Sequence, residues 1–258
     1  MQLSFVRTLN GGSESYLAVA KTSDGLDRVL KVLLPNDMDF TAEIAALKAE
    51  NGLGYAPLFE SDETNHTLVL ELLGAPIANS GLSTEDQLQI IANVLTRSWH
   101  ASSDRLGLVY GGSKADWLEN HLRQTPAHIG KAIDKACVNK GLELIERRRV
   151  NWREEEFDVV HDDAHEDNTL AVPAGDKGAY KLVDPDGLLF EASYDLGILL
   201  WNWIKSYVQA PAQIFSQRAN WLSEQTHVDR TAIMAWGYIE IISTGIHLLE
   251  LGYPDEGD

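Results

Sequence analysis

The sequence predicts an α+β fold in two parts: a small antiparallel five-stranded part with one helix over residues 1–74, and a larger, mainly helical part over residues 75–258. Three observations predict this division. Short β-branched apolar runs fill the first part, and turn residues separate them. One stretch among them repeats its apolar residues at helical spacing. After the break at Gly74-Ala75-Pro76, amphipathic stretches preceded by capping residues dominate the chain.

The first part is expected to form one sheet. Its strands are predicted at residues 2–9, 16–22, 27–34, 57–61 and 67–73. Turn residues separate the first three strands, with Asn10-Gly11-Gly12-Ser13 in one connection and Ser23-Asp24-Gly25 in the next. Two hairpins in series predict a three-stranded antiparallel meander. The helical pattern covers about 39–50, where Phe40, Ile44 and Leu47 share one face.

Helix signals organise the second part. Ser83, with Asp86 three residues later, predicts the start of a helix that runs to about His100. Ser113, with Asp116 three residues on, predicts the start of another. Strands and loops fill residues 157–190. Further helices are expected from Pro126 or Ala127 to Arg149, from Tyr194, from near Gln213 and from near Asp229.

The composition is that of a globular protein with little affinity for nucleic acid. The 258 residues are 44% hydrophobic and 23% charged, and their formal net charge is -18. Because phosphates need Lys and Arg to replace their counterions, this balance argues against a nucleic-acid partner. It favours solubility and is compatible with a cationic partner.

Three further features predict a cytoplasmic protein without a membrane partner. The single cysteine, Cys137, excludes an intramolecular disulfide and suits a reducing compartment. The N-terminus has no apolar signal core. The most apolar stretch, 231–251, is interrupted by Glu240 and His247, which indicates a buried core helix and not a membrane span.

The octet HDDAHEDN at residues 161–168 is the most informative stretch of the chain. An apolar run leads into it, and another leads into VDPDG at residues 183–187. This is the layout of a phosphotransfer loop. One Asp accepts the proton of a substrate hydroxyl, an Asn five residues later binds a metal, and an Asp on the next strand binds the same metal.

These roles select particular residues. Asp163 is the candidate catalytic base. Asn168 and Asp184 are the candidate ligands of Mg²⁺, a cation that prefers oxygen donors. Asp186 either shares the metal or only forms the Asp-Gly turn.

Residues of the first part are candidates for binding the nucleotide. Lys31 lies within an apolar strand, where a buried charge needs a partner, and can meet the phosphates of ATP. Glu43, early on the following helix, is its expected partner, and Glu50 is the alternative. The loop with Gly11, Gly12 and Ser13 could fold over the phosphates. Glu71 begins the segment to Gly74, whose backbone groups are expected to bind adenine.

Residues around the octet are assigned supporting or substrate roles. We expect His161 to be structural and Asp195, in YDLG at 194–197, to accept backbone N–H bonds of the loop or to cap the helix there. His165 either stabilises the loop or contacts substrate. The remaining substrate candidates are acidic: Asp162, Glu166 and Glu191. All seven tryptophans follow residue 74, so a flat apolar surface for a sugar ring is available only there.

Taken together, the strand lysine, the helix glutamate, the HxDxxxxN loop and the metal Asp make the chain similar to the aminoglycoside phosphotransferase family of the protein-kinase-like fold. The pattern VDPDGLLFEASYDLG most resembles the streptomycin 6-phosphotransferase and hydroxyurea kinase branch. The sequence departs from the family pattern where Asp162 replaces the usual Gly, where Ala164 replaces the usual Leu, and where Glu166-Asp167 stand in place of Pro or Gly.

This resemblance implies a two-lobe kinase of a small molecule that uses ATP and Mg²⁺. It implies Asp163 as the base, Asn168 and Asp184 as metal ligands, and Lys31 with Glu43 as the phosphate-positioning pair. The expected acceptor is cationic, an aminoglycoside such as streptomycin, and the expected role is antibiotic resistance. The alternatives are a kinase of a sugar, an amino alcohol or hydroxyurea, and a pseudokinase that binds nucleotide without transferring phosphate.

Overall fold

The structure is a computed structural model, and it describes residues 2–10, 12, 15–34, 40–99, 107–124, 132–173, 179–202 and 211–252. The chain divides into two compact units. Unit 1 contains Met1–Val109 and Asp163–Leu188, and unit 2 contains Tyr110–Asp162 and Leu189–Asp258. Each unit therefore combines two stretches of sequence. The boundary predicted after residue 74 falls inside unit 1.

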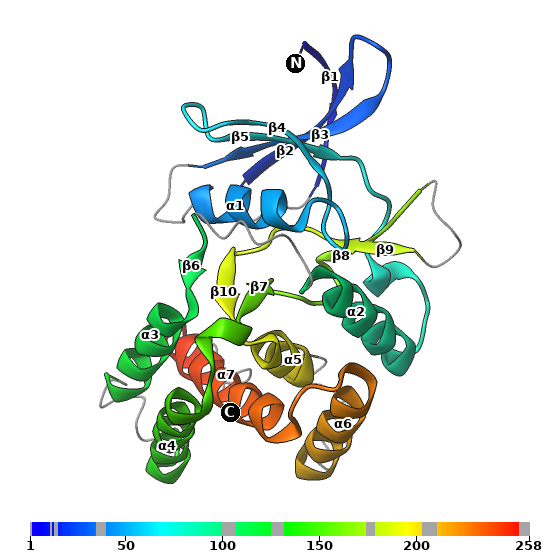
Figure 1. The fold of residues 1–258 in the computed structure, drawn as a ribbon. Coiled ribbons are helices and arrows are strands. Elements are labelled where there is room, and N and C mark those ends of the chain that lie inside the picture. Colours follow the sequence, from blue (N-terminus) through cyan, green and yellow to red (C-terminus); the bar gives the residue numbers. More distant parts are fainter. Residues whose placement is uncertain are drawn as a thin grey trace. The chain divides into compact units, whose positions relative to one another are not determined.

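Unit 1 contains the antiparallel five-stranded sheet that the sequence predicts. Its strands, in spatial order β1-β2-β3-β5-β4, are β1 Leu3–Thr8, β2 Ser15–Thr22, β3 Asp27–Leu33, β5 Thr67–Glu71 and β4 Leu58–Asp62. Helix α1 (Phe40–Glu50) lies beside this sheet (Figure 1). Ala42 and Ala46 of α1 are fully buried, as expected for a helix between a sheet and further structure. The predicted meander, helix and last two strands are confirmed.

The rest of unit 1 explains why the second stretch of sequence belongs to it. Helix α2 (Thr84–Ser98) begins at the predicted cap, where Ser83 accepts the N–H of Asp86 at 3.1 Å. Strands β8 (Thr169–Ala171) and β9 (Tyr180–Leu182) form a hairpin. Leu182 accepts the N–H of Ala56 and donates its own to Gly54, both at 2.8 Å. These bonds join residues 163–188 to the chain around residue 55, a link that linear sequence does not reveal.

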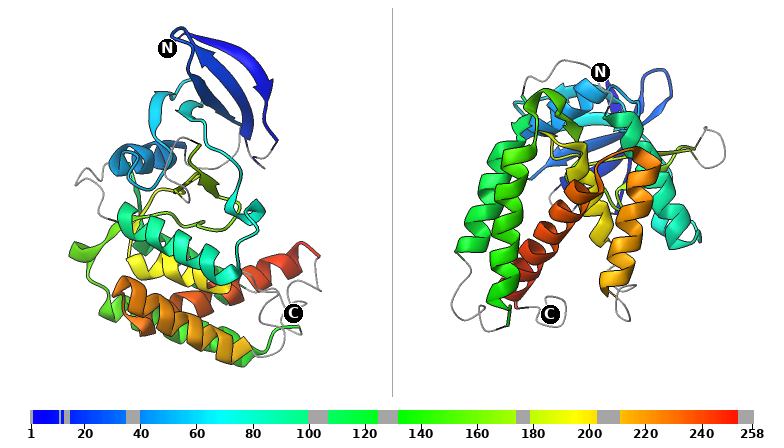
Figure 2. Two further views of the ribbon diagram at one scale, coloured as in Figure 1. Left: turned by 90° about the vertical axis from the view of Figure 1, so that its right-hand side faces the viewer. Right: turned by 60° about the horizontal axis from the view of Figure 1, so that its bottom comes forward.

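Unit 2 is mainly helical (Figure 2). Its helices are α3 Gly111–Arg123, α4 Lys135–Asn151, α5 Ala192–Trp201, α6 Pro211–Thr226 and α7 Arg230–Glu250. Strands β6 (Val109–Tyr110), β10 (Leu188–Phe190) and β7 (Asp158–Val160) pair in that order. Helix α7 packs against the other four helices of the unit.

Helix α7 is long and apolar enough to cross a membrane by length and composition alone. Its side chains nevertheless pack inside unit 2. Trp236 is fully buried, with its ring centroid 5.0 Å from that of Phe190 and 5.3 Å from that of Tyr194. Ile233, Ile239 and Ile246 are also fully buried. These contacts are those of the core helix that the sequence predicts.

Two predicted helix starts are wrong. Helix α3 begins at Gly111 and not at Ser113, because its first residue packs so closely on the Phe190 ring that a Cβ at Gly111 would overlap it. Helix α4 begins at Lys135, where Asp134 accepts the N–H of Ala136 at 2.8 Å. A tertiary contact sets the first start, and a cap later in the sequence than expected sets the second.

Candidate active site

The octet forms a loop between β7 and β8, and Asn168 ties the end of this loop to Asp163. The Asn168 side-chain amide donates to the Asp163 Oδ2 at 2.9 Å and to the Asp163 carbonyl at 3.1 Å. The Asp163 side chain is 55% exposed. The predicted base is thus held at a fixed place in the loop while its carboxylate stays open to a reactant.

Lys31 makes two ion pairs inside unit 1. Its Nζ lies 2.7 Å from the Glu43 Oε1 and 3.0 Å from the Asp184 Oδ1. Lys31 and Glu43 are each 6% exposed, whereas the Asp184 side chain is 38% exposed. Burial alone would lower the pKa of Lys31, but the charges of Asp184 and Glu43 outweigh it and raise the pKa. A charged lysine therefore connects strand β3, helix α1 and the VDPDG motif.

Backbone geometry brings the two motifs of the site together. The Val183 N–H donates to the Asn168 carbonyl at 3.0 Å, directly before Asp184. Asp184 has φ 59° and Gly187 has φ 74°, so the chain turns sharply between them. A Cβ at Gly187 would overlap the backbone of Ala42. Glycine at this position lets α1 lie against the motif one residue before Glu43.

A cavity of about 640 Å³ lies next to these side chains in unit 1. Its polar lining includes Lys31, Asn168 and Asp184. The apolar residues that line it are Leu9, Leu17, Val29, Ala56, Leu70, Leu72, Leu73, Pro76, Leu170 and Val183. An apolar lining with a few polar groups is the usual composition of a cofactor pocket.

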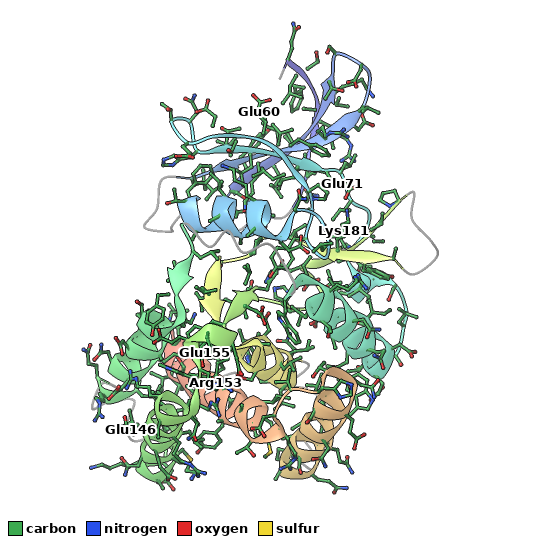
Figure 3. The ribbon with its side chains drawn as sticks, in the orientation of Figure 1. Glu60, Glu71, Glu146, Arg153, Glu155 and Lys181 are labelled. Atoms are coloured by element: carbon green, nitrogen blue, oxygen red, sulfur yellow. The ribbon has the colours of Figure 1, made fainter. Side chains whose placement is uncertain are left out.

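Besides Lys31, two predicted nucleotide contacts line this cavity, and two lie outside the described residues. Gly12 lines it with φ 80°, a backbone conformation that favours glycine. Gly11 and Ser13 are not among the described residues. Glu71 also lines the cavity, and its side chain points toward Lys181, which donates to it at 2.7 Å (Figure 3).

The choice between Glu43 and Glu50 is settled by their contacts. Glu50 is fully buried at the C-terminal end of α1 and accepts the backbone N–H groups of Gly52 and Gly54. It therefore closes the turn after the helix. Glu43 is the partner of Lys31.

The start of the octet is held by Asp195. The His161 N–H lies 2.9 Å and 3.1 Å from the two Asp195 carboxylate oxygens, and the Asp162 N–H donates to Asp195 Oδ1 at 3.0 Å. Asp195 lies in the first turn of α5, whose N-cap is Glu191. Of the two alternatives for Asp195, the structure shows the backbone contact and not the cap.

His165 contacts its own loop. Its Nδ1 accepts the N–H of Asp167 at 3.1 Å, and its Nε2 lies 3.4 Å from the Asp163 Oδ2. Burial lowers the pKa of His165, but the adjacent Asp163 outweighs burial and raises it. The backbone of Glu166 is fixed too, since its carbonyl accepts the N–H of Ala78 at 3.3 Å. The contacts of His165 are those of loop stabilisation.

Two substrate candidates have charged partners inside unit 2. The Asp162 Oδ2 lies 2.9 Å from the Lys114 Nζ. Glu191 pairs with Arg148 through both carboxylate oxygens and accepts from the Trp236 indole at 2.9 Å. Because basic side chains already pair with these carboxylates, Asp162 and Glu191 are not substrate contacts in our assignment. The acidic triplet 154–156 is exposed, and Figure 3 shows Glu155 beside its partner Arg153.

The donors present fit Mg²⁺. Among the described residues, no group of three or more His, Cys, Asp or Glu side chains could hold a metal ion. Asn168 and Asp184 offer one amide and one carboxylate oxygen, and Mg²⁺ is usually bound by one or two protein ligands together with phosphates and waters. The Asn168 amide nitrogen already donates to Asp163, which leaves its oxygen for the cation.

Comparison with known proteins identifies the family to which the chain is similar. Residues 4–252 match the family described as aminoglycoside/hydroxyurea antibiotic resistance kinase. A streptomycin 6-kinase of Streptomyces glaucescens is 24% identical over 247 residues, which are 94% of this chain and 77% of that protein.

Solved structures show the same fold. Choline kinase LicA from Streptococcus pneumoniae has a TM-score of 0.61 at 18% identity, covering 99% of this chain and 87% of that one. Aminoglycoside phosphotransferase APH(3'')-Id from Streptomyces rimosus ATCC10970, solved with ADP and streptomycin, has a TM-score of 0.57 at 14% identity. That likeness covers 86% of this chain and 89% of the other. The α+β fold is that of the protein-kinase-like aminoglycoside phosphotransferases.

The family match spans nearly the whole described chain, and it agrees with the resemblance read from the octet and the VDPDG motif. The chain belongs to the aminoglycoside/hydroxyurea antibiotic resistance kinase family and is a small-molecule kinase.

Proposed function

We propose that this kinase transfers the γ-phosphate of ATP, with Mg²⁺, to a hydroxyl of an aminoglycoside such as streptomycin. The observation that carries the proposal is the arrangement around Lys31. This buried lysine contacts both Glu43 and Asp184, and Asp184 directly follows the residue that hydrogen-bonds Asn168 of the octet. Lysine, metal ligands and base thus belong to one unit of the protein.

Each residue has a role in this proposal. Asp163 accepts the proton of the acceptor hydroxyl as the oxygen attacks the phosphate. Lys31, oriented by Glu43, holds the phosphates of the nucleotide. Asn168 and Asp184 hold the metal, which when bound neutralises charge on the phosphates. The cavity lined by Val29, Leu70 and Glu71 receives the adenine of the nucleotide.

Membership of the family suggests which ligand each of the two predicted parts binds. The five-stranded part, which we place at residues 1–74, binds nucleotide, and the helical part at residues 75–258 receives the acceptor. We propose the boundary between these two parts after Gly74.

A cationic acceptor is supported by charge. The formal net charge of the chain is -18, so a polyamine sugar is attracted and an anionic sugar repelled. In the octet, Glu166 and Asp167 have no side-chain ion pair with a basic residue among the described contacts. The ADP and streptomycin complex of APH(3'')-Id shows that a protein of this fold binds both ligands.

The test is a screen of ATP-dependent phosphorylation, read by the mass of the product. The panel holds streptomycin, other aminoglycosides, choline, neutral sugars and hydroxyurea, each with Mg²⁺ and ATP. We expect streptomycin or another aminoglycoside to gain one phosphate group. Phosphorylation of choline, a sugar or hydroxyurea alone would leave the kinase chemistry standing and replace the acceptor. No transfer to any acceptor, with nucleotide still bound, would support the pseudokinase alternative.

A further inference from the structure

Asp162 has a backbone conformation that rarely suits a side chain. Its φ is 70°, in the left-handed region where the Cβ of an L-residue meets its own backbone. Glycine takes this conformation without penalty, and asparagine and aspartate tolerate it better than other residues. Asp162 immediately precedes Asp163 in the chain. The strained backbone of Asp162 therefore sets the direction of the chain at Asp163, the proposed catalytic base.

The side chain of Asp162 is held from helix α3. Lys114, in the first turns of that helix, lies with its Nζ 2.9 Å from the Asp162 Oδ2. The Asp162 side chain is 4% exposed and that of Lys114 is 24% exposed. A carboxylate so deeply buried is costly without a charged partner. Lys114 supplies that partner.

Lys114 also interacts with a second acid. Glu240 of α7 is half-buried and accepts a hydrogen bond from the Tyr194 hydroxyl. Burial raises the pKa of Glu240, the charge of Lys114 opposes this shift, and the charge of Asp162 adds to it. The Lys114 Nζ lies 5.9 Å from the centre of the Tyr194 ring. The lysine thus stands in one polar cluster with Asp162, Tyr194 and Glu240, all in unit 2.

The turn has two separate supports. Asp195 accepts the N–H groups of His161 and Asp162 and so holds the backbone. Lys114 holds the side chain of Asp162. Asp195 alone fixes the two amides but leaves a buried carboxylate without a cation. The second support is therefore needed because residue 162 is an aspartate.

We propose that Lys114 is a positioning residue for phosphotransfer: by pairing with Asp162 it holds the left-handed turn that fixes where the chain places Asp163. The inference rests on the proposed function, because it assigns Lys114 a role in that reaction. It makes a specific claim about dependence. The effect of Lys114 on kcat requires a carboxylate at residue 162, whereas its effect on Glu240 does not.

The experiment is a double-mutant cycle with Lys114→Met, Asp162→Gly and the double variant. Displacement of a catalytic group by even 1 Å can cost on the order of 100-fold, so we expect Lys114→Met to lower kcat about 30-fold or more. The KM for ATP should stay within about 2-fold, because Lys31 and the cavity are untouched. Asp162→Gly should lower kcat only about 3-fold, since glycine keeps the turn but loosens it.

The double variant decides between positioning and general packing. We expect its kcat to return to within about 3-fold of Asp162→Gly, because no carboxylate remains at residue 162 to be held. Lys140→Met, an exposed lysine paired with Glu143 on α4, is the matched control and should leave kcat unchanged. In thermal unfolding without substrate, measured on the four proteins of the cycle, Lys114→Met should lower the unfolding temperature less when residue 162 is glycine.

Three outcomes overturn the inference. They are a near-normal kcat in Lys114→Met, a double variant as slow as Lys114→Met, and the absence of any coupling in thermal unfolding. Failure of the proposed function is a different result, because the unmodified protein then transfers no phosphate to any acceptor. In that case the unfolding cycle still shows whether Lys114 holds Asp162.

Discussion

Two lysines, one in each unit, are paired with an aspartate of the catalytic motifs, and they differ in what they hold. Lys31 contacts Glu43 and the half-open Asp184, beside a cavity of about 640 Å³. Lys114 contacts the enclosed Asp162. The first is therefore placed to meet a ligand and the second to hold the chain. The two pairs differ in the exposure of the aspartate, which is 38% for Asp184 and 4% for Asp162.

Loss of the base is the change with the largest expected effect. Asp163→Asn should lower kcat by about 10³-fold or more, because no other group of the octet is placed to accept the hydroxyl proton. Its side chain is exposed, so the unfolding temperature should hardly change. Steady-state kinetics with saturating ATP and acceptor provide the measurement. A near-normal kcat would show that another residue is the catalytic base.

The next largest effect separates the two aspartates of VDPDG. Asp184→Ala removes a proposed metal ligand and a partner of Lys31, and we expect Mg²⁺-dependent nucleotide binding to be lost. Asp186→Ala should weaken it far less. Mg²⁺ titrations of both variants with a fixed amount of nucleotide check the ranking. The reverse ranking would shift the metal site by two residues.

A smaller effect is expected at the contact between α1 and the motif. An alanine at Gly187 would overlap the backbone of Ala42 and push α1, with Glu43, away from Lys31. Gly187→Ala should lower kcat/KM for ATP about 10-fold. Gly25→Ala is the matched control, since Gly25 has φ 86° but nothing within 4 Å of a new Cβ. Equal losses in both variants would attribute the effect to backbone strain alone.

Ionic strength should have the smallest effect, and it should change only the KM of the acceptor. Between about 0.05 M and 0.5 M salt, the KM of a cationic acceptor should rise several-fold, because exposed charges are screened. The KM for a neutral acceptor provides the control. An acceptor KM that ignores salt would argue against attraction by the acidic surface, while the kinase assignment would stand.

The sequence predicts the candidate residues of the proposed chemistry, and Asp195 as a support of the loop, but it misses charged partners from distant stretches of the chain. Lys31 stands out because a charge interrupts an apolar strand, and Asp163, Asn168 and Asp184 because their spacing is that of a known loop. Lys114 is 48 residues from Asp162 and has no such local signal. The same holds for Arg148, which pairs with Glu191 43 residues away. Such partners are chosen by tertiary packing.

Where the sequence left alternatives open, local geometry decided them. Glu43 and Glu50 lie on nearly the same side of α1, and only the turn at Gly52 and Gly54 shows which one is already bound. Asp162 looked like a substrate contact because it adds charge beside the base. Its positive φ and its ion pair give it a structural role, and neither can be read from residue type.

The most direct test compares the two lysines in one measurement, the affinity for ATP with Mg²⁺ by isothermal titration of Lys31→Met and Lys114→Met. We expect Lys31→Met to weaken binding about 10-fold or more, since the phosphates lose their cation. Lys114→Met should bind within about 2-fold of the unmodified protein. Equal affinities in the two variants, whether both weakened or both unchanged, would contradict the assignment of Lys31 to the nucleotide and Lys114 to the turn.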